Sequence, residues 1–243
     1  MSGSEDEVIW LRPEKPTRGK TPAYNRADIA AAGVRIADAV GLDGLSMRKV
    51  AAELGAGTMS LYRYVRSKDE LLALMVDSIL GDPESWPGDY RDWAGVLRLC
   101  AHGSRSAVLE HPWFPVASVY ANPPGPNMLR AMEHMMAALD RPGLRIDELF
   151  QIVTTVMTFA QGYAQNELAE RAAGLGTGPV EETTTEAEKR YMVRMAESGE
   201  YPYLSRLIAE ARTPHQDADA QFDAMLDWVI EGILARVRAY VDL

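Results

Sequence analysis

The chain has 243 residues, 47% of them hydrophobic and 25% charged, which is the composition of a globular protein able to bury a sizeable core. Its formal net charge is −10. The single cysteine, Cys100, excludes an intrachain disulfide, and the acidic start MSGSEDEVIW lacks the positive charge of a signal peptide, so we expect a cytoplasmic protein.

Helical spacing dominates the sequence and the alternation typical of strands is scarce, so we predict an all-α protein. We divide it into a flexible arm over 1–24, where three prolines oppose regular structure, and two folded parts. The first is a three-helix helix-turn-helix head over 25–67. The second is a larger helical domain over 68–243 that binds an effector and forms a dimer.

Caps and glycines set the predicted bounds of the head helices. The first helix runs over 25–40 and ends at Gly41. Ser46 can cap a second helix that stops at Gly55, and Thr58 can cap a very short third helix. A fourth helix, in SKDELLALMVDSIL, starts at a serine and a glutamate with the spacing of a capping box, Ser67 and Glu70.

The stretch LSMRKVAAELGAGTMSLYRYV has the features of a helix-turn-helix, in which two short helices meet steeply across a glycine-containing turn. Ala51 is small where the helices cross, and Gly55 permits the backbone conformation of the turn. The apolar side chains that lock the pair together are Val50, Leu54, Leu61 and Val65.

The third helix presents polar and aromatic side chains that packing does not require. A helix fits the major groove of DNA, where base edges offer distinct donor, acceptor and methyl patterns. Arg63 can read guanine or hold a phosphate, and Met59 suits a thymine methyl group. One of the two tyrosines can instead belong to the core, because only one can face fully outward. The predicted DNA contacts are Ser46, Arg48, Thr58, Met59, Ser60, Tyr62, Arg63, Tyr64 and Lys68.

Charge is distributed unevenly along the chain. Residues 12–68 hold 11 Lys or Arg against 5 Asp or Glu, whereas residues 69–243 hold 14 against 27. This asymmetry indicates a basic module that faces a polyanion, attached to an acidic body. The alternative is that the charges only solubilise the surface. The same choice applies to the basic residues of the arm, which can sample the minor groove or the DNA backbone: Arg12, Lys15, Arg18 and Lys20.

Beyond residue 81 the spacing predicts helices over roughly 90–110, 126–139, 147–170, 186–198, 203–211 and 216–240. Between them, HPWFPVASVYANPPGPN should form an irregular or briefly helical crossing, and GLGTGPVEETTTE a mobile linker. The helix over 147–170 contains 18 consecutive uncharged residues. Its many Gln, Thr and Asn side chains distinguish it from a membrane span, so we interpret it as a helix buried on several sides, and we expect no membrane partner.

Residues 26–80 resemble the DNA-binding domain of tetracycline-repressor (TetR) family transcriptional regulators, through LSMRKVAAELG, SLYRYV and SKDELL. The proline-rich crossing and the two long helices after it resemble, less specifically, the C-terminal domain of the tetracycline repressors. The resemblance implies a homodimer whose heads read a palindromic operator in double-stranded DNA and whose body binds a small effector. It places the DNA contacts on the positions given above. Tetracycline itself is not implied, because PVASVY lacks the histidine that those repressors use there.

The last predicted helix carries an apolar stripe wider than one face of a monomer needs. It resembles the dimerising helix of the family, which pairs with the helix over 147–170 in an intersubunit four-helix bundle. The alternative is that both helices fill the core of their own subunit. The predicted dimer residues are Leu149, Val153, Val156, Ala160, Phe222, Met225, Leu226, Val229, Ile233 and Val237.

A further set of residues mixes large apolar surface with a few polar groups, as small-molecule sites do. The predicted effector pocket comprises Trp93, His102, Trp113, Phe114, Tyr120, Met128, Met132, Met135, Met157, Gln161, Tyr163 and Asn166. Its methionines follow helical spacing, so the alternative is that they belong to the core. The four histidines of the chain are scattered without ligand spacing, and we predict no metal and no cofactor.

These features together predict a dimeric repressor that a small hydrophobic effector releases from its operator by displacing the helix over 68–80. An activator of the same fold, and a small-molecule-binding helical protein without a DNA role, are the alternatives. The sequence has no P-loop, no nucleotide-binding glycine fingerprint and no nucleophile elbow, which argues against an enzyme.

Overall fold

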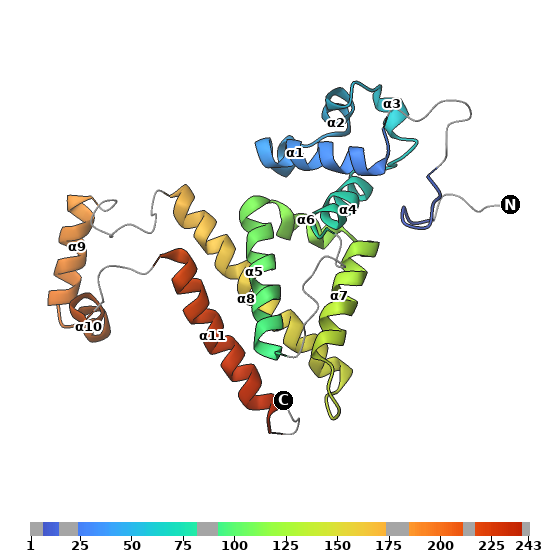
Figure 1. The fold of residues 1–243 in the computed structure, drawn as a ribbon. Coiled ribbons are helices and arrows are strands. Elements are labelled where there is room, and N and C mark those ends of the chain that lie inside the picture. Colours follow the sequence, from blue (N-terminus) through green and yellow to red (C-terminus); the bar gives the residue numbers. More distant parts are fainter. Residues whose placement is uncertain (1–6, 15–23, 82–91, 174–184, 211–216, 240–243) are drawn as a thin grey trace.

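The computed structural model describes residues 7–14, 24–81, 92–173, 185–210 and 217–239. Within these ranges the chain forms helices and no strand, which confirms the predicted all-α class. A small head sits on a larger body, from which a pair of helices projects (Figure 1). The head and its connection to the body comprise α1 (Arg26–Gly44), α2 (Met47–Glu53), α3 (Thr58–Leu61) and α4 (Lys68–Ile79). The body comprises α5 (Trp93–Glu110), α6 (Phe114–Tyr120), α7 (Pro126–Leu139), α8 (Ile146–Ala172) and α11 (Ala218–Val237), and the projecting pair is α9 (Glu186–Glu197) and α10 (Pro202–Glu210).

Local sequence determines where α1 begins and ends. The side chain of Asn25 accepts the backbone N–H of Asp28, and the Asp28 carboxylate accepts the N–H of Asn25 in return, which makes a complete capping box. Near the other end, Gly41 has a φ of +70°, a conformation that favours glycine. Regular helix therefore breaks at Gly41, where the sequence predicted its end, although α1 resumes as far as Gly44.

Two predicted caps differ from the structure. Gly57 occupies the N-cap position of α3 and Thr58 is its first residue, so Thr58 does not cap the helix. Ser67 does cap α4, since its hydroxyl accepts the N–H of Glu70 at 3.1 Å. The Glu70 carboxylate, however, accepts the N–H of Arg66, and it also binds a buried arginine from the N-terminal segment.

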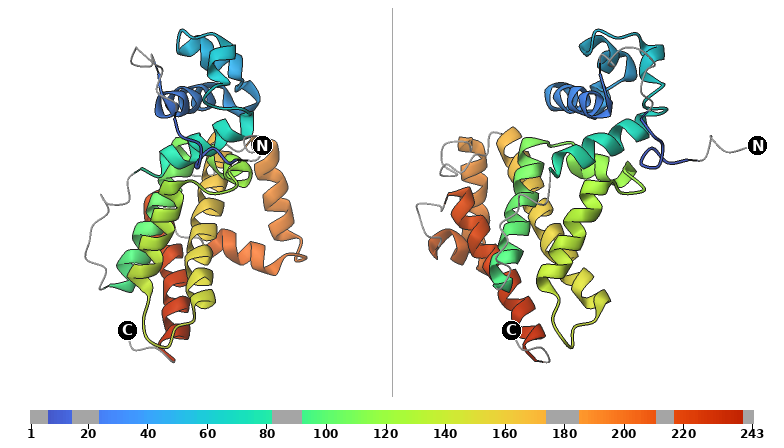
Figure 2. Two further views of the ribbon diagram at one scale, coloured as in Figure 1. Left: turned by 90° about the vertical axis from the view of Figure 1, so that its right-hand side faces the viewer. Right: turned by 45° about the vertical axis from the view of Figure 1, so that its right-hand side comes forward.

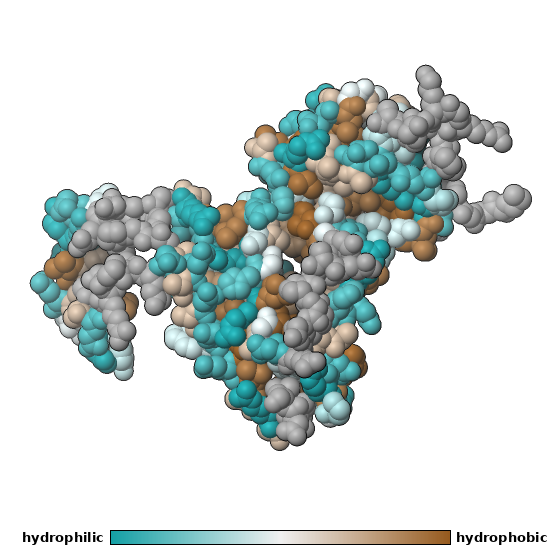
Figure 3. Space-filling model, in the orientation of Figure 1, coloured by the Kyte–Doolittle hydropathy of each residue, from teal (hydrophilic) through white to brown (hydrophobic). Residues whose placement is uncertain are grey.

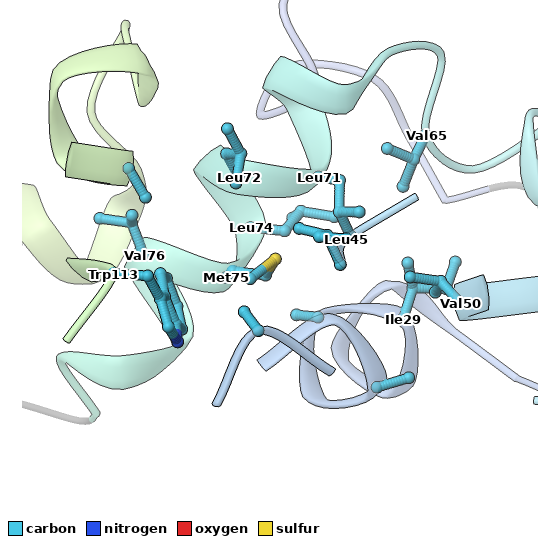
Figure 4. Packing of buried hydrophobic residues seen from close by; sticks show 14 of the residues in the cluster. Ile29, Leu45, Val50, Val65, Leu71, Leu72, Leu74, Met75, Val76 and Trp113 are labelled. Carbon is cyan, nitrogen blue, oxygen red and sulfur yellow. The ribbon is translucent and has the colours of Figure 1, made fainter. Parts of the chain in front are cut away.

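Helix α4 connects the head to the body by packing against both. Met75 points toward α1 (Figure 4), where the absence of a side chain on Gly33 leaves room for it. A Cβ atom added to Gly33 would lie 2.7 Å from the Met75 sulfur. Val76 lies in the same buried cluster as Trp113 of the body. Apolar residues are also seen at the surface where head and body meet (Figure 3). Because α4 belongs to both parts, a domain boundary at residue 67 stays a prediction.

In the body, α5 and α8 form a central pair, with α7 and α11 packed against it (Figures 1 and 2). Their shared core includes Leu97, Val156 and Leu226, each at most 1% exposed. The crossing predicted to be irregular or briefly helical contains the short helix α6. All but the last two residues of the predicted linker GLGTGPVEETTTE lie outside the described residues. In the part of the chain that the structure covers, no helix is long and apolar enough to cross a membrane.

An ion cluster with a buried centre, Arg105 and Glu167, lies between α5, α8 and α11. The Arg105 guanidinium donates to Glu167, at 3.0 Å from Nε, and to Asp219, at 2.7 Å from Nη1. It also stacks on the Phe222 ring, 4.9 Å from the centroid. Burial alone would lower the pKa of Arg105, but the two carboxylates favour its charged form and the pKa is raised. Glu167 is also paired with Arg171 of the same helix. Through Arg105, the cluster joins α5 to Glu167 of α8 and to Asp219 of α11.

The start of α7 is capped by a side chain from α4. Gly125, at the N-cap position, has no side chain to accept the first amides of the helix. Asp77 supplies the acceptor, since its Oδ1 accepts the N–H groups of Asn127 at 2.9 Å and Met128 at 3.0 Å. Burial raises the pKa of Asp77, although these two N–H groups act in the opposite direction. The start of α7 is thereby bonded to α4.

Helices α9 and α10 pack on each other and project from the body (Figures 1 and 2). α9 begins at a capping box between Thr185 and Glu188. No residue of α9 is buried, and large apolar side chains remain exposed on both helices, including Tyr191 at 61% and Tyr203 at 81%.

Residues 7–14 pack against the junction of head and body and do not form the flexible arm that the sequence predicted for 1–24. Ile9 is 3% exposed in the same buried cluster as residues of α1, α4 and α6. Arg12 is 9% exposed because it binds Glu70. The rest of the predicted arm, apart from Tyr24, lies outside the described residues.

Candidate nucleic-acid interface and dimer faces

The inner side of the helix-turn-helix is a compact apolar core. Val50, Ala51, Leu61 and Val65 are each at most 1% exposed. Gly55, in the turn between α2 and α3, has a φ of +63°, which explains why a glycine stands there. This core fixes α3 relative to α2, so the side chains on the outer side of α3 are held in a defined orientation.

The outer side of α3 and the turn after it expose side chains that can contact DNA. Met59 is 80% exposed and Tyr62 is 41% exposed. Arg63 is exposed beside them, as is Arg48 on α2. Thr58 is half-buried at the start of the helix. The structure therefore brings the predicted contacts of α3 onto one side of the head, with an arginine and a tyrosine at its end.

Two other predicted contacts are tied to Tyr24, which precedes α1. Tyr64 is half-buried, with its ring centroid 5.2 Å from that of Tyr24, so Tyr62 is the tyrosine that faces outward. Ser60 Oγ donates to the carbonyl of Gly57 at 2.7 Å and lies 2.7 Å from the Tyr24 hydroxyl. Tyr24 is not among the contacts predicted from the sequence. Its place directly before the N-cap of α1 was the available signal.

Ser46 and Lys68 have bonding partners inside the head. Ser46 Oγ accepts the N–H of Lys49 at 3.3 Å and so caps α2. Lys68 Nζ donates to the carbonyl of Leu42 at 2.9 Å, near the end of α1. A contact from either residue to DNA would compete with these bonds, and both assignments stay predictions.

Arg12 does not extend toward DNA as the sequence suggested. Its guanidinium is buried and donates to the Glu70 carboxylate at 2.7 Å and to the Tyr64 carbonyl at 3.4 Å. The remaining basic residues proposed for the arm, Lys15, Arg18 and Lys20, lie outside the described residues.

Most side chains predicted to form the dimer interface are buried inside their own subunit. They lie on the sides of α8 and α11 that pack against each other and against α5, so they support the body and are inaccessible to a partner. These residues are Leu149, Val153, Val156, Ala160, Phe222, Leu226 and Val237. Val229 and Ile233 are half-buried against the same core, and Met225 is half-buried.

Uncharged side chains make up most of the free sides of α8 and α11. A shallow groove on α8 is lined by Phe150, Gln151, Thr154, Thr155 and Thr158. On α11, the stripe away from the core consists of Gln221, Ala224, Met225, Trp228, Gly232 and Ala235, with Trp228 72% exposed. Asp223 and Asp227 of α11 lie on another side, where they pair with His102 and Arg98 of α5. Glu231 is exposed and, by helical spacing, borders the stripe between Trp228 and Ala235.

Comparison with known proteins connects these features to one family. Residues 29–75 match the family model for bacterial regulatory proteins of the tetR family, and residues 86–237 match that for the tetracyclin repressor-like C-terminal domain. The chain belongs to the TetR family. It is a TetR-family transcriptional regulator, with a DNA-binding head and a helical C-terminal domain.

Relatives of this TetR-family protein extend over most of its length. The HTH-type transcriptional repressor DrrR1 of Streptomyces coeruleorubidus is 34% identical over 239 residues, covering 96% of this chain and 87% of the relative. An HTH-type transcriptional regulator of Saccharopolyspora erythraea is 28% identical over 228 residues, covering 94% and 92%. The crystal structure of the Streptomyces coelicolor TetR family protein ActR in complex with actinorhodin superposes with a TM-score of 0.65 at 28% identity, covering 87% of this chain and 97% of ActR.

The residues predicted to line an effector pocket divide between two buried clusters of this TetR-family protein. In the body cluster, Trp93 and Met135 are buried, Met157 and Tyr163 are half-buried, and His102 contacts the Phe222 ring at 5.1 Å. The junction cluster contains Trp113, Phe114 and Met128. Met132 and Gln161 are half-buried, whereas Asn166 is exposed and Tyr120 is 57% exposed.

Trp113 shows why the pocket prediction does not describe a single cavity. Its Nε1 donates to the Asp38 carboxylate of α1 at 2.7 Å, and His111 Nδ1 lies 2.8 Å from the same oxygen. Trp113 is therefore part of the contact between body and head. Across the described part of the chain, no group of three or more His, Cys, Asp or Glu side chains is arranged to hold a metal ion.

Proposed function

We propose that this TetR-family regulator represses transcription by binding a palindromic operator as a homodimer, and that a small hydrophobic effector releases it. The observation that carries the proposal is the exposed outer side of α3, with Met59, Tyr62 and Arg63, on a head whose sequence is locally basic. Such a surface is complementary to the major groove and to phosphates, whereas the acidic body is not.

Each side chain of this surface has a distinct role in the proposal. Arg63 reads a guanine edge or holds a phosphate, and Arg48 reaches the base edges or the backbone from α2. Met59 contacts a thymine methyl group. The Tyr62 hydroxyl donates to a phosphate, and Ser60, already held by Tyr24, presents its remaining hydrogen-bonding capacity to the groove.

The free sides of α8 and α11 form the proposed homodimer interface. A second copy of this chain is the partner, because α8 and α11 of two subunits can build a four-helix bundle around a two-fold axis. The stripe on α11 suits close helix contact, since Gly232 and Ala235 are small and Trp228 is a large exposed anchor. This assignment replaces the buried residues predicted from the sequence with those that the fold leaves accessible.

Release by an effector follows from the connections between body and head. Asp77 joins α4 to α7, and Trp113 joins the body to Asp38 of α1. An effector that binds better to a body arrangement in which these contacts have shifted would favour the state that does not bind the operator. Two findings on similar proteins support this: DrrR1 is a transcriptional repressor, and ActR has been solved with actinorhodin and with (S)-DNPA. The proposed place of action is the cytoplasm, where the operator DNA lies.

The proposal is tested by selecting sequences from random duplex DNA with the full-length protein and measuring their affinity. We expect a palindromic site to be enriched. Arg63→Ala should weaken binding to that site by about 1–3 kcal/mol and reduce the salt dependence, and Tyr62→Ala should act in the same direction. Titration of the complex with small hydrophobic compounds then tests release.

Arg98→Ala is the matched control, because it removes the same charge from an exposed position in the body. It should leave operator affinity unchanged. If no sequence is enriched, or if Arg63→Ala and Tyr62→Ala together bind as well as the unmodified protein, the DNA role of α3 is wrong.

A further inference from the structure

Residues 7–14, which we call the N-terminal strap, form a second connection between head and body beside α4 (Figure 2). Ile9 is 3% exposed and lies in the buried cluster that contains residues of α1, α4 and α6. Ile9 thus anchors the strap in the apolar contact between head and body. The strap is a second link between them, in addition to α4, through which the chain itself passes from head to body.

The strap contacts the body through Trp10. Its indole Nε1 donates to the carbonyl of Pro123, in the loop before α7, at 3.0 Å. The ring packs against Gly125, where an added Cβ atom would lie 2.7 Å from Trp10 Cζ2. The same position would place that atom 2.4 Å from the Asp77 carboxylate, so strap, α4 and the start of α7 meet at one glycine.

The strap contacts the head through Arg12 and its own backbone. Arg12 Nη2 lies 2.7 Å from the Glu70 carboxylate at the start of α4. The Arg26 guanidinium, in the first turn of α1, donates to the carbonyls of Ile9 and Arg12, each at 2.9 Å. The Glu14 carboxylate accepts the N–H of Arg26 at 2.7 Å. The starts of two head helices are therefore bound to one short segment.

These contacts extend to the turn that follows α3. Arg12 Nη2 also donates to the carbonyl of Tyr64, at 3.4 Å. Tyr64 packs on Tyr24, and the Tyr24 hydroxyl bonds Ser60 of α3. A continuous set of contacts therefore runs from the loop before α7, through Trp10 and Arg12, to the proposed DNA-reading surface.

We propose that Trp10 and Arg12 are positioning residues for operator binding, which fix the orientation of each head on its body and so set the distance between the two heads of the dimer. The inference rests on the proposed function and extends it. Neither residue touches DNA. Without the contacts of Trp10 and Arg12, only α4 and the bonds to Asp38 would hold the head on the body, and the head could rotate more freely about the junction. A dimer would then discriminate less between operators whose half-sites are differently spaced.

One arm of the test measures spacing selectivity with the selected operator and with versions in which the half-sites are moved apart or together by about one or two base pairs. The unmodified protein should prefer one spacing. Trp10→Ala and Arg12→Ala should reduce that preference by at least about threefold, and Arg12→Lys, which keeps the pair with Glu70, should restore part of it. Leu11→Ala is the matched control, because Leu11 lies in the strap but is 71% exposed.

The second arm needs neither DNA nor a dimer. Spin labels are placed at Ala39→Cys of α1 and Glu133→Cys of α7, both exposed, in a Cys100→Ser background, and labelled chains are diluted with unlabelled ones. The distribution of distances between the two labels should be narrow in the protein with an unmodified strap and in the Leu11→Ala variant. It should broaden or shift in Trp10→Ala and Arg12→Ala.

An unchanged distance distribution in Trp10→Ala and Arg12→Ala overturns the inference, whatever the DNA result. So does an equal loss of affinity at every spacing, which is what a merely structural role produces. If no DNA is selected at all, the proposed function fails while the distance measurement still decides the role of the strap. Circular dichroism and urea unfolding establish that each variant is folded.

Discussion

The head and the body differ in how their functional surfaces stand out from their surroundings. The head is locally basic, and its outer side exposes Arg48, Arg63 and Tyr62 above an apolar core. The body is strongly acidic, yet the free sides of α8 and α11 are mostly uncharged, with Phe150 and Trp228 exposed. The first surface suits a polyanion and the second suits an identical, equally acidic partner, because faces with few charges limit repulsion between two negative bodies.

The two parts also differ in what lies inside them. The core between α1, α2 and α3 is built of aliphatic side chains such as Ile29 and Val50. The body encloses the charged cluster of Arg105 and Glu167 beside Phe222. Variants that change one surface or one core at a time can therefore separate DNA binding, dimer formation and folding from one another.

The largest effect is expected from Trp228→Glu, which places a charge on the free side of α11. Trp228 is 72% exposed in the subunit, so the variant should fold normally. Burying an unpaired carboxylate between two subunits is unfavourable, and the dimer should dissociate. Operator affinity should then fall by more than about 100-fold, because one head contributes only half of the site. Light scattering and operator titration measure the two losses.

Leu129→Glu is the control for that variant. Leu129 is 53% exposed on α7, outside the proposed interface, and the variant should remain dimeric. Phe222→Ala provides the opposite contrast, because Phe222 is fully buried and its truncation should lower the free energy of unfolding. A Trp228→Glu protein that stays dimeric would show that the second copy docks elsewhere.

The next effect concerns the charged cluster of the body. Arg105→Met removes the guanidinium that Glu167 and Asp219 share. Because Arg171 still pairs with Glu167, the free energy of unfolding should fall by about 1.5–3 kcal/mol, the contribution of hydrogen bonds to charged groups. Combining it with Glu167→Leu should recover most of this loss, since no buried carboxylate is then left. Urea unfolding at fixed protein concentration measures both values.

For comparison, Arg98→Ala breaks an exposed ion pair with Asp227 and should change the free energy of unfolding by less than about 1 kcal/mol. If the double variant is no more stable than Arg105→Met alone, the cluster contributes through packing on Phe222 and not through paired charge.

The smallest effect is expected where the head meets the body, at Asp77. Asp77→Ala removes the acceptor of two α7 amides and should lower the free energy of unfolding by about 1–3 kcal/mol. Asp77→Asn should lower the free energy of unfolding by less than Asp77→Ala does. Both α7 amides are bound to Oδ1, and an asparagine can keep an oxygen acceptor at that position. These variants test whether α4 and α7 are joined as tightly as the helices within each part.

The stability of the contact between Asp77 and α7 should depend on pH, because the pKa of Asp77 is raised. The folded state holds the Asp77 proton more tightly than the unfolded state, so this contribution to stability is present below the unfolded pKa and is lost as the pH rises through the folded pKa. The stability of the unmodified protein relative to Asp77→Asn should therefore decline from about pH 4 upward. A difference that stays constant between about pH 4 and about pH 7 would contradict the assigned cause.

The order of the helices, the glycine turn of the head and the main caps could be predicted from local sequence. Asn25, Ser46 and Ser67 cap helices by bonds to residues three positions on, and Gly55 responds to the backbone of its own turn. Interactions of this range depend only on residues that are close together in the sequence, so the sequence predicts them. The outward position of Met59 and Arg63 followed for the same reason, since neighbouring positions must supply the core.

Which side of α8 and α11 faces the core could not be predicted in this way. Between residues 149 and 166 of α8 every side chain is uncharged, so helical spacing alone does not distinguish the buried Val156 from the exposed Phe150. Only the packing of α8 against α5 and α11 decides it. The capping of α7 by Asp77 and the capture of Arg12 by Glu70 likewise join residues about 50 or more positions apart, and contacts over such distances exist only once the helices have been placed in space.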